Sequence, residues 1–173
     1  MRAITLRVFS SAFLIILFVS VVHAQKTKAP EPAPIPPQIA AARKVFISNA
    51  GGDSVVAFTG SETFDGGPDR PYNEFYAAMK SWGKYQIVSS PSQSDLIFEI
   101  NWTLGDAQLK APVLGELRLT IIDARMGVAL WSFMDYVQSA FLLSNRDKNF
   151  DAAMNELVGA MKAQQASAGP ATQ

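Results

Sequence analysis

The side chains that could do chemistry in this chain are almost all carboxylates. The sequence contains no cysteine and a single histidine, His23, which lies in an N-terminal segment with the features of a cleaved export signal. Histidine is the usual general base near neutral pH, and cysteine and histidine are the usual zinc ligands. We therefore expect the mature protein to have no Ser-His-Asp triad, no cysteine nucleophile and no Cys/His zinc site.

A pair of carboxylates is the remaining route to hydrolysis, as in glycosidases. The candidates are Glu99 and Glu116, or the acids of a glycine-rich loop at Asp53–Arg70. Such an enzyme needs a cleft and one carboxyl group with a raised pKa, and the sequence indicates neither. The loop acids also lack the spacing of a calcium loop, and Gly51 and Gly52 lack the lysine and hydroxyl of a phosphate-binding loop. We expect no catalytic residue, no metal and no cofactor.

The N-terminus has the three parts of a secretory signal. Arg2 and Arg7 give it a basic start, Val8 to Val22 form an apolar core, and small residues precede a cleavage point after Ala24. The apolar core is shorter than the ~20 residues that a helix needs to cross a bilayer. We therefore expect cleavage, a periplasmic or secreted product, and no integral membrane segment after cleavage; a retained membrane anchor is the alternative.

The mature chain divides into three parts by composition. Residues 25–40 are rich in proline and predict an extended linker, residues 41–165 predict one domain with its own core, and residues 166–173 predict a disordered tail. Removing the signal leaves a small acidic excess, because the full chain is neutral and the signal contains only basic charges. Nucleic acid is therefore not an expected partner, since it selects a strong basic surplus.

Three alternating apolar runs between Asp95 and Val137 predict a β-meander around which the domain is built. A strand at 43–49, a helix at 71–82 and a strand at 85–88 precede it, and a second helix follows it. That helix has an apolar stripe of Phe150, Met154, Leu157, Val158 and Met161. The expected fold is α+β, a two-layer α/β sandwich in the order βαβββα, with a mixed, mostly antiparallel sheet and two helices on one face.

The polar face of the meander is the candidate interface. Arg118 could pair with Glu99 across two strands. We favour a four-residue loop, Ala124 to Gly127, in the last hairpin. It places Trp131 and Phe133 on this face, where they form an amphipathic patch typical of binding interfaces; a three-residue loop would turn them to the other face. The Asp53–Arg70 loop could instead cover both aromatic side chains.

The order of elements, the string YNEFYAAMKSWGKYQIVSSPSQSDLIFEI and the hairpin pattern of Asp123, Gly127 and Trp131 resemble a group of uncharacterised secreted bacterial proteins. More distantly, the architecture is similar to small α/β modules of envelope lipoproteins of unknown function and to the N-terminal domain of TolB. The resemblance covers about Lys44 to Ala163. It implies a fold and a compartment, with no catalytic residues, and this chain departs from the lipoproteins in having no cysteine to carry a lipid.

Three functions are compatible with these observations. The first is a non-catalytic extracytoplasmic binding or assembly module of the bacterial envelope, whose partner is an unknown envelope protein or cell-wall component. The second is a hydrolase that uses two carboxylates, and the third is a small-ligand carrier, which would need an enclosed apolar cavity. We favour the binding module because the usual catalytic side chains are missing.

Overall fold

The computed structural model describes residues 33–52, 63–104 and 113–167. The expected signal, residues 25–32 of the expected linker, residues 53–62 of the glycine-rich loop and residues 168–173 of the expected tail lie outside these ranges. The compact unit comprises Pro34–Gln173.

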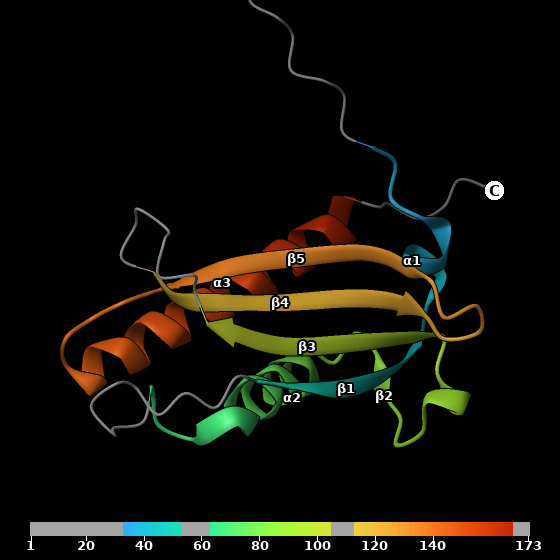
Figure 1. The fold of residues 1–173 in the computed structure, drawn as a ribbon. Coiled ribbons are helices and arrows are strands. Elements are labelled where there is room, and N and C mark those ends of the chain that lie inside the picture. Colours follow the sequence, from blue (N-terminus) through green and yellow to red (C-terminus); the bar gives the residue numbers. More distant parts are fainter. Residues whose placement is uncertain (1–32, 53–62, 105–112, 168–173) are drawn as a thin grey trace, which may run out of the picture. The chain divides into compact units, whose positions relative to one another are not determined.

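The domain is a five-stranded sheet with two long helices packed behind it (Figure 1). Its helices and strands, in chain order, are α1 (Pro37–Ala41), β1 (Lys44–Gly52), α2 (Arg70–Trp82), β2 (Gln86–Ile87), β3 (Leu96–Leu104), β4 (Val113–Asp123), β5 (Ala129–Gln138) and α3 (Leu143–Ser167). Short 3-10 helices η1 (Gly67–Asp69) and η2 (Pro91–Gln93) lie in the connections. The strand order is β2-β1-β3-β4-β5, with β2 and β3 parallel to β1 and the remaining pairs antiparallel. The expected α+β fold, a mixed sheet with two long helices on one face, is confirmed. The order βαβββα is short of one strand, because the described residues form five strands, and α1 precedes them.

The core lies between the sheet and the helices α2 and α3. Alternate residues of β3 are buried, as their period of two predicted, and so are Leu117, Leu119 and Ile121 of β4. Phe75 and Met79 of α2 and the whole predicted stripe of α3 cover this face. Gly83 ends α2 with a positive φ of 66°, a conformation that glycine adopts at little cost.

The packed part of the chain begins before residue 41. Residues 37–41, which the composition assigns mostly to the linker, form α1, and Ile39 within it is completely buried in the core. Pro37 is compatible with a helix start because the first helical residues need no N–H donor. The proline-rich composition therefore gave no indication of α1, which Ile39 anchors in the core.

The hairpin between β4 and β5 contains a bulge that the sequence does not reveal. Its loop has the expected four residues, since Asp123 N–H donates to the Val128 carbonyl (2.9 Å) and Ile122 pairs with Ala129. The register then shifts, so that Ile121 pairs with Trp131 and Leu130 is the extra residue. Because one inserted residue turns every later side chain to the opposite face, this bulge decides which side of β5 faces the helices.

Trp102 occupies a narrow slot at one end of the core. Its side chain is 1% exposed and makes an edge-on contact with Phe64, with ring centroids 5.2 Å apart. Gly115 of β4 lies directly against it: a Cβ at this position would be 2.3 Å from the Trp102 ring and 2.4 Å from the Thr103 carbonyl oxygen. The slot therefore exists only because residue 115 has no side chain.

Arg70 joins the end of the glycine-rich loop to both long helices. Its guanidinium donates to Glu74 (2.5 Å), Asp147 (2.6 Å) and Asp151 (2.6 Å), and to the Asp65 carbonyl (3.0 Å). The side chain is only 11% exposed and lies over the Phe150 ring, 4.5 Å from its centroid. Asp147 also accepts the Asp65 N–H at 2.9 Å. We call this group of residues the Arg70 clasp.

The clasp makes folding stability depend on acid pH. Burial acts to raise the pKa of Asp147, but the Asp65 N–H, the Arg70 hydrogen bond and the charges of Arg70 and Arg146 outweigh it, so this pKa lies below its ordinary value. A carboxyl group with a lowered pKa in the folded state stabilises the fold above its unfolded pKa, and this contribution is lost as the pH falls through the folded pKa.

We therefore expect the unfolding free energy of Asp147→Asn to fall less steeply than that of wild type as the pH is lowered from about 5 to about 2. Urea unfolding followed by circular dichroism at a series of pH values measures it. The same substitution in an Arg70→Met background is the control and should change the slope much less. Parallel curves for wild type and Asp147→Asn would contradict this role of Asp147.

Candidate functional site

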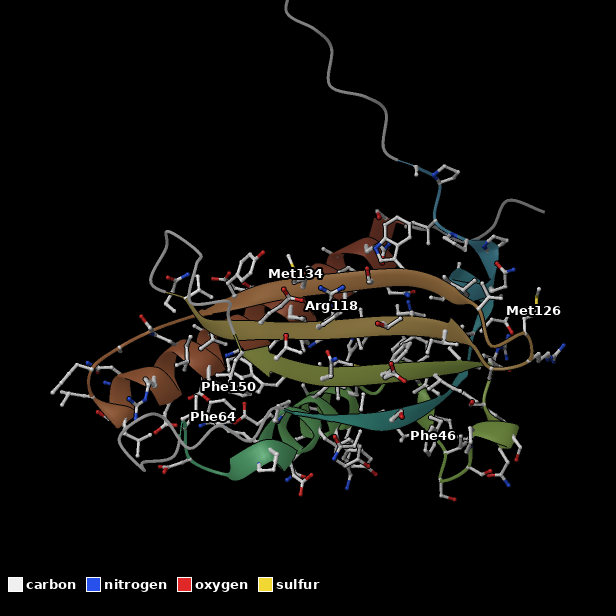
Figure 2. The ribbon with its side chains drawn as sticks, viewed as in Figure 1. Phe46, Phe64, Arg118, Met126, Met134 and Phe150 are labelled. Atoms are coloured by element: carbon white, nitrogen blue, oxygen red, sulfur yellow. The ribbon has the colours of Figure 1, made fainter. Side chains whose placement is uncertain are left out.

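The candidate site is the face of the sheet opposite α2 and α3, which we call the open face (Figure 2). Its residues alternate with the buried core residues along four strands. They are Phe46 and Ser48 of β1, Ile97, Glu99, Asn101 and Thr103 of β3, Glu116, Arg118, Thr120 and Ile122 of β4, and Ser132, Met134 and Tyr136 of β5. No described helix packs on this face.

The strand register arranges the open face in rows across the sheet. Phe46, Ile97 and Ile122 lie side by side and form an apolar row, each residue half-buried. At the other end of the face, Met134 and Tyr136 of β5 are 47% and 43% exposed. Scattered exposed apolar residues are ordinary, but here they lie on one flat surface with polar groups between them. That composition is the one found at protein–protein interfaces with a polar rim.

The charges on the open face leave one carboxylate unpaired among the described residues. Arg118 donates from Nε to Glu116 Oε1 at 2.8 Å, and its second contact with that oxygen forms the ion pair between them. The register places Arg118 opposite Asn101 and Glu99 opposite Thr120. The expected Arg118–Glu99 pair is therefore wrong: Arg118 binds its neighbour on the same strand. Glu99 remains available to a cation or hydrogen-bond donor.

Trp131 and Phe133 do not lie on the open face. They pair with Ile121 and Leu119, whose side chains are buried in the core, so both aromatic side chains point towards the helix side. There they are partly buried and pack against the core. The expected patch of Trp131, Phe133, Glu99 and Arg118 is thus divided between two faces. The four-residue loop was predicted correctly. By itself it would place Trp131 and Phe133 on the open face, and the bulge at Leu130 turns them to the helix side.

The residues that replace them on the open face are Ser132, Met134 and Tyr136, which the sequence reasoning missed. One signal was present in the chain: Trp131 and Phe133 alternate with polar Ser132 and flexible Met134. With a bulge included, the larger aromatic residues would fall on the buried side, where large apolar side chains are most often found.

The two candidate carboxylates of a hydrolase, Glu99 and Glu116, come from neighbouring strands of the open face. Glu116 lies opposite Thr103, which is four residues along β3 from Glu99. At a rise of about 3.3 Å per residue, their backbones are ~13 Å apart along the sheet. Glu116 is also bound to Arg118. Among the loop acids that are described, Asp69 accepts a hydrogen bond from Asn49 (2.8 Å).

A depression of about 510 Å³ lies at the hairpin end of the sheet, next to Arg43, Lys44, Asp95 and Arg125. Asp95 accepts the N–H groups of Arg43 and Lys44, each at 2.9 Å, and these bonds, aided by the charge of Arg125, lower the pKa of its carboxyl group. The carboxylate therefore ties the start of β1 to that of β3. The depression is open to solvent, which is unlike the enclosed site that a carrier needs.

The described residues contain no group of three or more acidic, histidine or cysteine side chains placed to hold a metal ion. Within the same ranges, none of the helices has both the length and the apolar composition needed to cross a membrane.

Neither a family model nor a curated protein matches the sequence. Solved structures with a similar arrangement include protein XCC0632 from Xanthomonas campestris (TM-score 0.44, 17% identity, covering 80% of this chain and 93% of that chain). They also include the PelC dodecamer from Paraburkholderia phytofirmans (TM-score 0.43, 10% identity, 77% and 93%). A third is lipoprotein GNA1162 from Neisseria meningitidis (TM-score 0.39, 16% identity, 72% and 99%). Similar structures thus include a lipoprotein, whereas membership of a particular secreted family stays a prediction.

Proposed function

We propose that this chain is a non-catalytic binding or assembly module that works outside the bacterial cytoplasm, and that the open face is its contact surface. The observation that carries the proposal is the amphipathic face on which no described helix packs, with Met134 and Tyr136 each more than two-fifths exposed. The export-like N-terminal segment supports the location. The partner is an envelope protein or cell-wall component.

The chemistry of the face limits what the partner presents. Apolar groups fit over the row of Phe46, Ile97 and Ile122, because covering half-buried apolar area is favourable at roughly 25 cal/mol per Å². A cation or N–H donor fits over Glu99, which forms no ion pair with a described residue. A partner that covers the Glu99 carboxylate would not be strongly acidic, since like charges repel across an interface.

Site-specific photo-crosslinking in the living cell tests the proposal. A benzophenone amino acid at Thr120, in the middle of the open face, should give defined adducts with envelope components. The same amino acid at Glu156, which is exposed on the outer side of α3, is the matched control and should give none. The Thr120 adducts should weaken when Glu99 is changed to Arg. Equal labelling from both positions, or adducts from Glu156 alone, would rule out the open face as the contact surface.

The hydrolase alternative has a separate readout. If the purified chain cleaves a glycan, and both Glu99→Gln and Glu116→Gln abolish the cleavage, the carboxylate mechanism is favoured over the binding module. We expect no such activity because Glu116 already binds Arg118 and the backbones of the two glutamates lie four residues apart along the sheet.

A further inference from the structure

β5 is one of the two outer strands of the sheet, and its hydrogen-bonding direction follows from that of β4. Ala124 N–H donates to the Asp95 carbonyl, so the even-numbered residues of β4 direct their backbone groups towards β3. Its odd-numbered residues therefore bond to β5, where their partners are Trp131, Phe133 and Asp135. Because backbone direction alternates along an antiparallel strand, Ser132, Met134 and Tyr136 direct their N–H and C=O groups outwards.

Two side-chain contacts confirm this direction and close one half of the edge. The outward N–H of Tyr136 donates to the carboxylate of Asp135 at 2.7 Å. The outward carbonyl of Gln138 accepts a hydrogen bond from Asn149 of α3 at 2.9 Å. At the other end of the strand, the bulge at Leu130 interrupts the edge. Such local caps and bulges are common ways to prevent unwanted strand pairing.

The middle of the edge has no such protection. The N–H and C=O groups of Ser132 and Met134 point outwards, and no described residue bonds to them on this side. Neither lysine nor proline occurs in β5, and its one charged residue, Asp135, is turned to the backbone of Tyr136. A strand edge with unpaired backbone groups is a template for another strand.

We infer that two copies of this chain pair antiparallel through β5, with the two-fold axis at Phe133. Ser132 of each copy then lies opposite Met134 of the other, and every free backbone group of these two residues finds a partner. This register needs neither the Tyr136 N–H nor the Gln138 carbonyl, which are already bonded. The same set of groups is complementary to itself, which favours a second copy over an unrelated strand.

The side chains agree with this register. The two Phe133 side chains, each partly exposed on the helix side, meet across the axis as an aromatic cross-strand pair. Asp135 lies opposite Trp131 of the second copy. A register centred on Asp135 would instead place two like charges face to face, which is unfavourable. The result is a continuous ten-stranded sheet, built from two copies of the five-stranded one.

Single cysteines test the register, because the chain has none of its own. Residues on the axis have Cα atoms about 4.5 Å apart, which suits a disulfide. Phe133→Cys should therefore give a covalent dimer under mild oxidation. Ser132→Cys is the control. The cysteines at position 132 of the two copies are offset by two residues along the strands, so their Cα atoms are more than about 7 Å apart and no bridge should form. Equal cross-linking at both positions would overturn the register.

Proline at an outward position tests the edge itself. Met134→Pro removes an N–H that β4 does not use, so the fold should be retained, while the mass measured by light scattering should fall from two chains to one. Met134→Ala keeps the N–H and should remain a dimer. A dimeric Met134→Pro that retains its circular dichroism would overturn the inference. The inference would also be overturned if the wild-type chain were a monomer and Phe133→Cys formed no disulfide. If Met134→Pro fails to fold, the comparison of Phe133→Cys with Ser132→Cys decides.

Discussion

Replacing Gly115 with alanine should lower the free energy of unfolding by about 3 kcal/mol or more, the upper end for overpacking a rigid core. The added methyl group would be 2.3 Å from the ring of Trp102 and 2.4 Å from the Thr103 carbonyl oxygen. Neither neighbour can move easily: the ring is 1% exposed, and Thr103 is held in the β3–β4 ladder opposite Glu116. The strain must therefore spread into the backbone of both strands.

Equilibrium urea unfolding measures this effect, and Gly159→Ala is the matched control. Gly159 lies on the exposed side of α3, and a Cβ there would meet no atom within 4 Å. Alanine is favoured over glycine in a helix by up to ~1 kcal/mol, so this variant should be slightly more stable than wild type. Ordinary surface substitutions change the free energy of unfolding by up to about 0.5 kcal/mol. If Gly115→Ala changes it by no more than that, Trp102 does not pack closely against β4.

The second large effect is expected for Arg70→Met, which should cost about 2 to 3 kcal/mol of folding free energy, between the value of an exposed ion pair and that of a fully buried one. The methionine keeps the apolar stem over Phe150 but removes the charge. Glu74, Asp147 and Asp151 would then face one another without a cation. Like charges left together in a partly buried place are unfavourable because water screens them incompletely. Burial acts to lower the pKa of the Arg70 guanidinium, and its carboxylate partners raise it more, so it stays charged.

Arg118→Met is the control for Arg70→Met, because Arg118 also binds a carboxylate but is 50% exposed. Exposed ion pairs contribute about 0 to 1 kcal/mol, so this variant should unfold close to wild type. A similar loss in both variants would show that burial of the clasp is not the source of its stabilising effect. Limited proteolysis offers a second measurement: Arg70→Met should be cut faster near Asp65, whose N–H and carbonyl the clasp holds.

Much of the scaffold was predictable because it depends on short sequence periods. The alternation of Leu96, Phe98 and Ile100 identifies the buried face of β3, since side chains of a strand alternate between two faces. The spacing of Phe150, Met154 and Leu157 likewise identifies the buried face of α3. Both patterns are complete within one element, so no knowledge of its neighbours is needed.

The candidate site was not predictable in the same way. Its position on the sheet face opposite the helices follows from the alternation, and Glu99 and Arg118 were placed there correctly. The contribution of β5 depends on Leu130, because one extra residue exchanges Trp131 and Phe133 for Ser132 and Met134. A β-bulge has no fixed sequence pattern. Here it places the large aromatic side chains against the core, and only the folded chain shows that packing.

By itself, the sequence determined the α+β scaffold, the faces of its regular elements and the absence of histidine and cysteine chemistry from the expected mature chain. Only the tertiary structure decided the register of β5, the slot of Trp102 beside Gly115 and the partners of Arg70. Asp147 and Asp151 lie 77 and 81 residues from Arg70 in the chain. Contacts at such separations depend on how whole elements dock against one another, and local periodicity carries no information about that docking.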